Sequence, residues 1–165
     1  TNNDQFAEKI KMLRVHGQNK RYHYKHIGMG GRLDTIQAAI LLAKLAHYKE
    51  ELAERDRVAK NYSNSIKRSL TLPIIKSNRT SVWAQYTVRI NNRDKVQKKL
   101  QDKGIPTAIY YPVSLHLQEC FRYLNYKEND FPIAEEASSS VLRLPMNAYL
   151  TDDNISYITK TLNDI

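Results

Sequence analysis

The stretch RVHGQNKRYHYKHIGMGGRLDTIQAAILL, residues 14–42, decides most of what can be predicted about this chain of 165 residues. Its first residues end one predicted helix, and a basic, aromatic loop follows. Glycines at positions 28, 30 and 31 then form a turn that leads into a second helix. A loop of this composition offers hydrogen-bond donors and positive charge, which favours binding of an anionic ligand near residues 20–32.

A helix is predicted before this loop. Asp4 can cap it, and Phe6, Ile10 and Leu13 fall on one face at helical spacing. The sequence thus opens directly on a capped helix, followed by a loop that has the composition of a binding site. From this arrangement we expect it to be a piece of a larger protein.

A long helix, or two helices separated by a bend, is expected after the loop. Asp34 and Gln37 form a capping-box pattern, and apolar residues recur at helical spacing up to Ile66. Because about 30 helical residues exceed the usual length of a globular helix, we expect this segment to bridge two layers or two subunits. Its apolar face predicts self-association. A helical hairpin is the alternative, but no turn signal interrupts residues 33–63.

Short strands alternate with helices in the rest of the chain. Residues 81–90 alternate between apolar and polar side chains, which is typical of a half-buried strand. The other predicted elements are a helix after Asn92 that ends at Gly104, a strand at 105–110, a helix at 131–138, a strand at 140–144 that stops at Pro145, and a helix after Thr151. The predicted fold class is α+β: a long bridging helix followed by a small, mostly antiparallel sheet that helices cover.

These elements divide the chain into two parts. Residues 1–66 form the helical segment with the loop, which we expect to bridge to an N-terminal domain. Residues 67–165 form the α+β domain. Between them, residues 70–80 carry a proline and several polar side chains, which favours an irregular connection.

Composition argues against several classes of protein. The formal net charge of +9 and the pI near 9.6 invite a nucleic-acid interpretation, but the basic residues are dispersed and mixed with acidic ones, so we do not expect nucleic-acid binding. No apolar run reaches the roughly 20 residues of a membrane helix.

Cys120 is the only cysteine, so no intrachain disulfide forms and a cytoplasmic location is predicted. His23 and His26 lack the further ligands of a metal site.

Several short motifs follow one another along the chain. They are Val15-His16-Gly17, Gly31-Arg32-Leu33-Asp34 with Gln37-Ala38-Ala39, Lys103-Gly104-Ile105-Pro106-Thr107 with Ile109-Tyr110-Tyr111-Pro112 and Leu115-His116-Leu117-Gln118, and Leu144-Pro145-Met146 with Tyr149-Leu150-Thr151. In this order they resemble the C-terminal portion of the DegT/DnrJ/EryC1/StrS family, pyridoxal-phosphate-dependent aminotransferases that act on nucleotide-linked keto sugars. Residues 17–22, 32–36 and 81–86 resemble the subgroup that aminates the 3-keto position of a UDP-linked N-acetylated uronic acid.

This resemblance implies the C-terminal domain of a fold type I pyridoxal phosphate enzyme that works as a homodimer. It implies transfer of an amino group, usually from glutamate, to a keto sugar in the synthesis of bacterial surface polysaccharides. The Schiff-base lysine of the family lies N-terminal to the matched portion, and no lysine here sits in the family's Ser-x-x-Lys loop. On this interpretation the 165 residues alone are expected to be inactive and not to bind the cofactor covalently.

The resemblance also assigns roles to five residues. Gly30 stands where the family has an asparagine that reaches the cofactor phosphate of the other subunit, so only a backbone N–H remains for that contact. Arg32 is expected to bind a substrate phosphate or carboxylate, with a salt bridge to a neighbouring carboxylate as the alternative. Tyr110 and Tyr111 replace the family's His-Tyr pair, which approaches the sugar nucleotide. His116 matches a histidine of the family and is a further candidate for substrate binding.

Two other functions are kept as alternatives. The first is a non-catalytic, truncated domain that binds a nucleotide sugar or a partner subunit. The second is a basic module that binds nucleic acid, which would show strong salt dependence.

Overall fold

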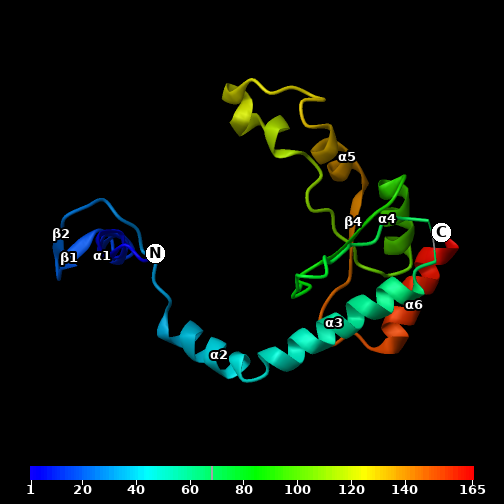
Figure 1. Ribbon diagram of the computed structural model, residues 1–165, viewed down its shortest axis with the longest axis horizontal. Coiled ribbons are helices and arrows are strands. Elements are labelled where there is room, and N and C mark those ends of the chain that lie inside the picture. The colour runs from blue at the N-terminus through cyan, green and yellow to red at the C-terminus, as the bar shows by residue number, and fades with distance from the viewer. Residues whose placement is uncertain (68) are drawn as a thin grey trace. The chain divides into compact units, whose positions relative to one another are not determined.

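The computed structural model describes residues 1–67 and 69–165 (Figure 1). The elements are α1 (Asp4–Leu13), β1 (Gln18–Lys20), β2 (His23–Tyr24), α2 (Thr35–Leu45), α3 (Tyr48–Ser65), β3 (Tyr86–Arg89), α4 (Arg93–Asp102), the 3-10 helices η1 (Leu115–Leu117) and η2 (Glu119–Leu124), α5 (Pro132–Ser140), β4 (Val141–Leu144) and α6 (Asp152–Asp164). Helices combine with two small antiparallel sheets, β1–β2 and β3–β4, which confirms the predicted α+β class. No helix in the described ranges is long and apolar enough to cross a membrane.

The chain forms two compact units, Thr1–Tyr48 and Lys49–Ile165. The division predicted from the sequence lies later, after residue 66, because it keeps the whole helical stretch together with the loop. The second half of α3 belongs to the hydrophobic core of the second unit, and for this reason the structural division falls earlier. The bridging role given to residues 1–66 stays a prediction.

The first unit begins with α1, and Asn3 caps it. The side-chain oxygen of Asn3 accepts a hydrogen bond from the backbone N–H of Phe6 at 3.0 Å. The predicted cap at Asp4 is therefore wrong by one residue. Both residue types are good N-caps, so the pattern alone does not choose between them. Asp4 lies instead in the first turn, where its negative charge interacts favourably with the helix dipole.

A small hairpin occupies part of the region that was predicted as a loop. In it β1 and β2 pair with Gln18 opposite Tyr24. The chain packs closely here because Gly17 has φ of +80° and no side chain; a Cβ at this position would lie 1.7 Å from the carbonyl oxygen of His26. The prediction missed the hairpin because its connecting residues contain neither glycine nor asparagine, the usual turn signals.

The helical stretch after the loop is two helices, which was one of the two possibilities left open. The capping box at the start of α2 is confirmed, since Oε1 of Gln37 accepts a hydrogen bond from the N–H of Asp34 at 3.4 Å. The first helix ends at Leu45 and α3 begins at Tyr48. Although α2 is mostly apolar, none of its residues is buried.

The second unit is built around one hydrophobic core. Helices α3, α4 and α6 contribute side chains, and so does one face of the β3–β4 sheet. The core residues are Val58, Ala59, Tyr62, Ile66, Trp83, Tyr86, Val88, Ile90, Val96, Leu100, Ile105, Leu142, Leu144, Met146, Ile155, Ile158 and Leu162. Burial alternates along both strands, so the sheet has a core face and an opposite face, and the predicted half-buried sheet is confirmed.

The strands themselves are shorter than predicted. The strand predicted at 81–90 is reduced to β3, because its partner β4 has only four residues to pair with it. The strand predicted at 105–110 does not form. Only Ala108 pairs there, in an isolated bridge with Arg143, and the preceding Pro106 has no N–H to donate. The strand predicted at 140–144 is confirmed as β4.

The helix-capping signals in the sequence agree with the observed ends of α4 and α6. Asn92 occupies the N-cap position of α4, although its side chain makes no capping hydrogen bond. The same helix ends in a Schellman motif: Gly104, with φ of +72°, donates to the carbonyl of Gln101, and Ile105 donates to that of Leu100, both at 2.9 Å. The predicted cap of α6 is confirmed, since Thr151 accepts from the N–H three residues later at 3.2 Å.

Candidate functional site

Gly30 and Arg32 lie on an exposed turn of the first unit, between β2 and α2. Gly30 pairs with Val15 in an isolated antiparallel bridge. The residues around it make the hydrogen bonds of this bridge; the N–H of Gly31, for example, donates to the carbonyl of Arg14 at 2.8 Å. No residue in the described ranges accepts from the N–H of Gly30, so this donor is available to a ligand.

The side chain of Arg32 is exposed, and among the described residues none forms an ion pair or hydrogen bond with it. The salt bridge to a neighbouring carboxylate, kept as the alternative for Arg32, is therefore not seen. Further positive charge lies close in the sequence, on the hairpin and just after it, where Lys20, Arg21 and Lys25 are exposed. This part of the first unit can offer one backbone N–H and several cationic side chains to an anion.

Tyr110 and Tyr111 lie in the second unit, on the irregular segment that follows the Ala108 bridge. Their side chains are 43% and 72% exposed, and their ring centroids are 5.7 Å apart. Both residues are thus open to solvent, and a tyrosine hydroxyl can donate a hydrogen bond to a ligand or accept one from it. The guanidinium carbon of Arg143 lies 5.9 Å from the centre of the Tyr110 ring, a cation–π contact that connects this segment to β4.

His116 is held by an acidic partner. Its Nε2 atom lies 2.9 Å from Oε1 of Glu135, and only 8% of its side chain is exposed. Its ring also packs against Phe131, with centroids 4.8 Å apart. Because a carboxylate only accepts hydrogen bonds, Nε2 carries the proton of this contact. What His116 can still offer to a ligand is therefore its Nδ1 atom.

The Glu135 carboxylate that holds His116 is itself held by the backbone. The N–H of Asn129 donates to both of its oxygens, at 3.0 and 2.9 Å, and the N–H of Phe131 donates at 3.2 Å. These backbone hydrogen bonds, with a further contribution from His116, lower the pKa of Glu135 against the opposing effect of partial burial. The hydrogen bond between His116 and Glu135 thus connects residues 115–131, a segment that includes η1 and η2, to α5.

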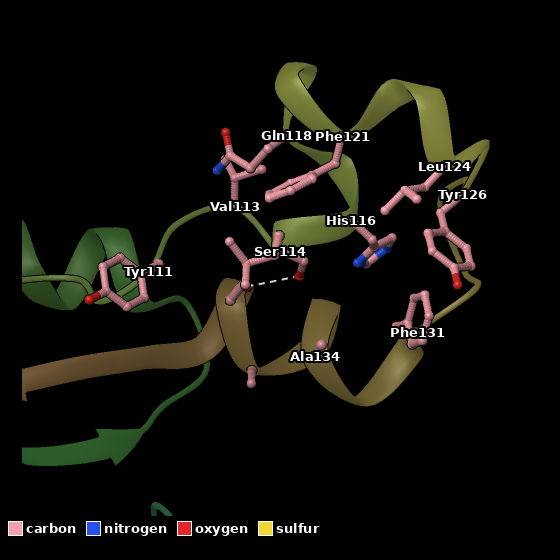
Figure 2. A pocket seen from close by; sticks show the side chains of 13 residues that line it. Tyr111, Val113, Ser114, His116, Gln118, Phe121, Leu124, Tyr126, Phe131 and Ala134 are labelled. Atoms are coloured by element: carbon pink, nitrogen blue, oxygen red, sulfur yellow. Dashed lines mark hydrogen bonds between the residues drawn. The ribbon is translucent and has the colours of Figure 1, made fainter. Parts of the chain in front are cut away.

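A cavity of about 680 Å³ lies between the segment of residues 115–131 and α5. Its lining is mainly apolar, with Tyr111 at one edge and the His116 ring between the 3-10 helices and Phe131 (Figure 2). The hydroxyls of Ser114 and Ser138 form a hydrogen bond of 3.0 Å in its wall. The lining residues are Tyr111, Val113, Ser114, Leu115, His116, Gln118, Phe121, Leu124, Tyr126, Phe131, Ala134, Ala137 and Ser138. The structure thus brings Tyr111 and His116 to one cavity, whereas Tyr110 contacts β4.

With this geometry in place, comparison with known proteins decides the family. The profile of the DegT/DnrJ/EryC1/StrS aminotransferase family matches residues 1–163. The chain belongs to this family. It is 42% identical over 165 residues to the UDP-2-acetamido-2-deoxy-3-oxo-D-glucuronate aminotransferase of Pseudomonas aeruginosa, covering 99% of this chain and 45% of that protein.

Solved structures agree with this assignment. A family aminotransferase from Brucella abortus is 35% identical with a TM-score of 0.89, covering 99% of this chain and 44% of its own. S. venezuelae DesV, solved in complex with a ketimine intermediate, is 30% identical with a TM-score of 0.92, covering 99% and 45%. The chain thus has the fold of part of a family aminotransferase, and it spans less than half the length of the relatives it matches.

The family's motifs led to Gly30, Arg32, Tyr110, Tyr111 and His116, but they did not reveal two residues that contact this set. Glu135, the partner of His116, lies 19 residues away in the sequence, so no local pattern connects them. Arg143 contacts Tyr110, and a signal for it existed: it is the one charged residue in the apolar strand β4. Within the described ranges, no group of histidine, cysteine and acidic residues is placed to hold a metal ion.

Proposed function

We propose that this chain is the C-terminal part of a pyridoxal-phosphate-dependent aminotransferase. The enzyme transfers an amino group from an amino acid, glutamate, to a nucleotide-linked keto sugar in the synthesis of bacterial surface polysaccharides in the cytoplasm. The observation that carries the proposal is the 42% identity, over 99% of this chain, to an aminotransferase of UDP-2-acetamido-2-deoxy-3-oxo-D-glucuronate. A UDP-linked N-acetylated 3-keto uronic acid is accordingly the proposed acceptor.

The residues of the first unit fit a phosphate group. The N–H of Gly30 has no acceptor among the described residues, and the turn that carries it is exposed and close in sequence to several cationic side chains. The N–H of Gly30 would donate a hydrogen bond to the cofactor phosphate, in place of the side-chain donor of the family's asparagine. Pyridoxal phosphate supplies the electron sink for moving the amino group.

The other proposed residues bind and orient the substrates. The free guanidinium of Arg32 forms charge-assisted hydrogen bonds with the diphosphate or the carboxylate of the sugar nucleotide. The exposed residues Tyr110 and Tyr111 bind the sugar nucleotide. His116 contributes its Nδ1 atom, while Glu135 holds the orientation of the ring.

We further propose that the enzyme is a homodimer and that its subunits share the active site. The support in the first unit is the apolar surface of α2, where Ile36, Ile40 and Leu42 are 72%, 55% and 70% exposed. Exposed apolar side chains gathered on one helix are typical of a protein interface. The remainder of the enzyme and the second subunit cover this surface.

A comparison of the complete enzyme with the 165-residue chain tests the proposal. The complete enzyme, with pyridoxal phosphate and glutamate, is expected to convert the UDP-linked 3-keto uronic acid into its 3-amino product, detected by mass spectrometry. The chain alone is expected to be inactive and to form no borohydride-reducible adduct with pyridoxal phosphate at a single lysine, because no Ser-x-x-Lys sequence occurs in it.

Two results would contradict this. A complete enzyme that binds the UDP-sugar without transferring an amino group would support the non-catalytic alternative. A single-lysine adduct in the isolated chain would place the Schiff-base lysine within these 165 residues.

A further inference from the structure

The face of the β3–β4 sheet that points away from the core carries two arginines. Arg89 and Arg143 occupy positions that alternate with the buried residues of their strands. Ala108 bridges to Arg143, so the side chains of these two residues share this face. The cation–π contact of 5.9 Å between Arg143 and Tyr110 places the Tyr110 ring beside the same arginine. A proposed substrate-binding tyrosine therefore lies beside an arginine on an open sheet face.

The two arginines differ in their partners. Nη2 of Arg89 lies 2.5 Å from the Glu136 carboxylate, and its Nε donates to Ser140 at 3.3 Å. The side chain of Arg143 has no ion-pair or hydrogen-bond partner in the part of the chain that the structure describes, and its Nε is fully buried without an acceptor. Its guanidinium carbon lies 5.9 Å from the centre of the Tyr110 ring.

A guanidinium without an acidic or carbonyl partner is available to an anionic ligand. The chain itself covers Nε of Arg143, so a ligand meets the outer edge of the guanidinium plane, which the two Nη atoms form. This edge matches the two oxygens of a carboxylate in a bidentate contact. The Tyr110 ring restricts the orientation of the plane and therefore prepares this edge for binding.

We propose that Arg143 binds a substrate carboxylate and that Tyr110 orients it. The inference rests on the proposed function and adds to it a binding residue outside the family's motifs. A carboxylate has two sources in the proposed reaction, the uronic acid of the sugar nucleotide and the amino-acid donor. Both share the planar anion that the free edge of Arg143 recognises.

Calorimetric binding to the complete enzyme separates these sources. The probes are UDP-N-acetylglucosaminuronic acid, its uncharged analogue UDP-N-acetylglucosamine, and glutarate, an unreactive analogue of the donor. If the uronate is the ligand, Arg143→Gln weakens binding of the uronate about tenfold or more and leaves the uncharged analogue unchanged. If the donor is the ligand, the same variant weakens glutarate binding and neither UDP-sugar. Either outcome supports the proposal.

Arg89→Gln is the matched control, because it removes a positive charge from the same sheet face at a residue that already has an acidic partner. It is expected to leave all three affinities unchanged. Arg143→Lys keeps the charge over the Tyr110 ring but loses the two-point edge, so it is expected to restore the affinity only in part.

Equal weakening of the charged and the uncharged UDP-sugar by Arg143→Gln would overturn the proposal, because Arg143 would then merely support Tyr110. Unchanged affinity for all three probes would overturn it as well. In both cases the wild-type enzyme still transfers the amino group, so the proposed function stands. A wild-type enzyme that binds neither UDP-sugar and transfers no amino group refutes the proposed function, and this inference with it.

Discussion

Replacing Arg93 with methionine is expected to destabilise the second unit. Arg93 begins α4 and is only 7% exposed. Its Nη1 atom donates to the carbonyls of Ser138 and Val141, both at 3.1 Å. These carbonyls lie at the junction where α5 ends and β4 begins, so Arg93 ties α4 to the strand that carries Arg143.

The magnitude follows from the two hydrogen bonds. Methionine fills much of the volume of Arg93 but leaves both carbonyls without this donor. The loss of each hydrogen bond lowers the free energy of unfolding by about 1–3 kcal/mol. This loss is offset in part because the variant no longer buries a charge. We expect the free energy of unfolding to fall by about 3 kcal/mol, a large share of the 5–15 kcal/mol typical of a domain. The contact between Arg93 and Asp94 adds little, because the Asp94 side chain is 81% exposed.

Urea unfolding monitored by the fluorescence of Trp83 measures this loss. Trp83 is the only tryptophan, and it is 9% exposed in the core of the second unit. With a urea slope of about 2 kcal/mol per molar, the midpoint should fall by about 1.5 M while the slope stays constant. Asp94→Ala is the matched control and should change the free energy of unfolding by less than about 1 kcal/mol. A loss below about 1 kcal/mol for Arg93→Met, or an equal loss in both variants, would refute the reasoning.

Three further predictions concern other parts of the chain. Because the pKa of Glu135 lies below its ordinary value of 4.5, its contribution to stability is complete above pH 4.5 and is lost as the pH falls through the lower native value. The protection factors for hydrogen exchange of residues 115–131, which are corrected for the intrinsic exchange rate at each pH, should fall on acidification, and Glu135→Gln should remove this pH dependence; an unaltered pH profile in the variant would contradict the assignment. Gly17→Ala should disrupt the hairpin of the first unit, seen as lost amide protection in β1 and β2, because a Cβ would lie 1.7 Å from the His26 carbonyl oxygen; retained protection would show that the backbone adapts. The 165-residue chain should self-associate in sedimentation through α2, and Ile40→Glu should weaken this, since Ile40 is 55% exposed; a wild-type monomer at high concentration would exclude the interface.

Features set by residues three to five positions apart were predictable from the sequence. The capping box of Asp34 with Gln37, the cap at Thr151 and the glycine end of α4 each use hydrogen bonds within one helical turn. The same holds for the alternation that places Tyr86 and Val88 on the core face. Where two adjacent residues were equally suitable, as with Asn3 and Asp4, the pattern did not distinguish them.

Features that depend on distant partners were not predictable in this way. The apolar residues at 105–110 suggested a strand, but only Ala108 finds a partner, because β4 is short and already pairs with β3. The β1–β2 hairpin was not predicted because its turn contains neither glycine nor asparagine. Its packing also depends on the close approach of Gly17 to the carbonyl of His26, nine residues later.

The candidate site shows the same difference between local features and features that depend on distant partners. Motif order and spacing can be read from the amino acids without knowledge of contacts, and they were enough to indicate the family and five candidate residues. What surrounds these residues became visible only in the folded chain. The tertiary structure places Glu135 on Nε2 of His116 and Arg143 over the ring of Tyr110, across 19 and 33 residues of sequence. Such contacts arise when separate elements pack together, so the availability of each side chain to a ligand is a property of the folded chain.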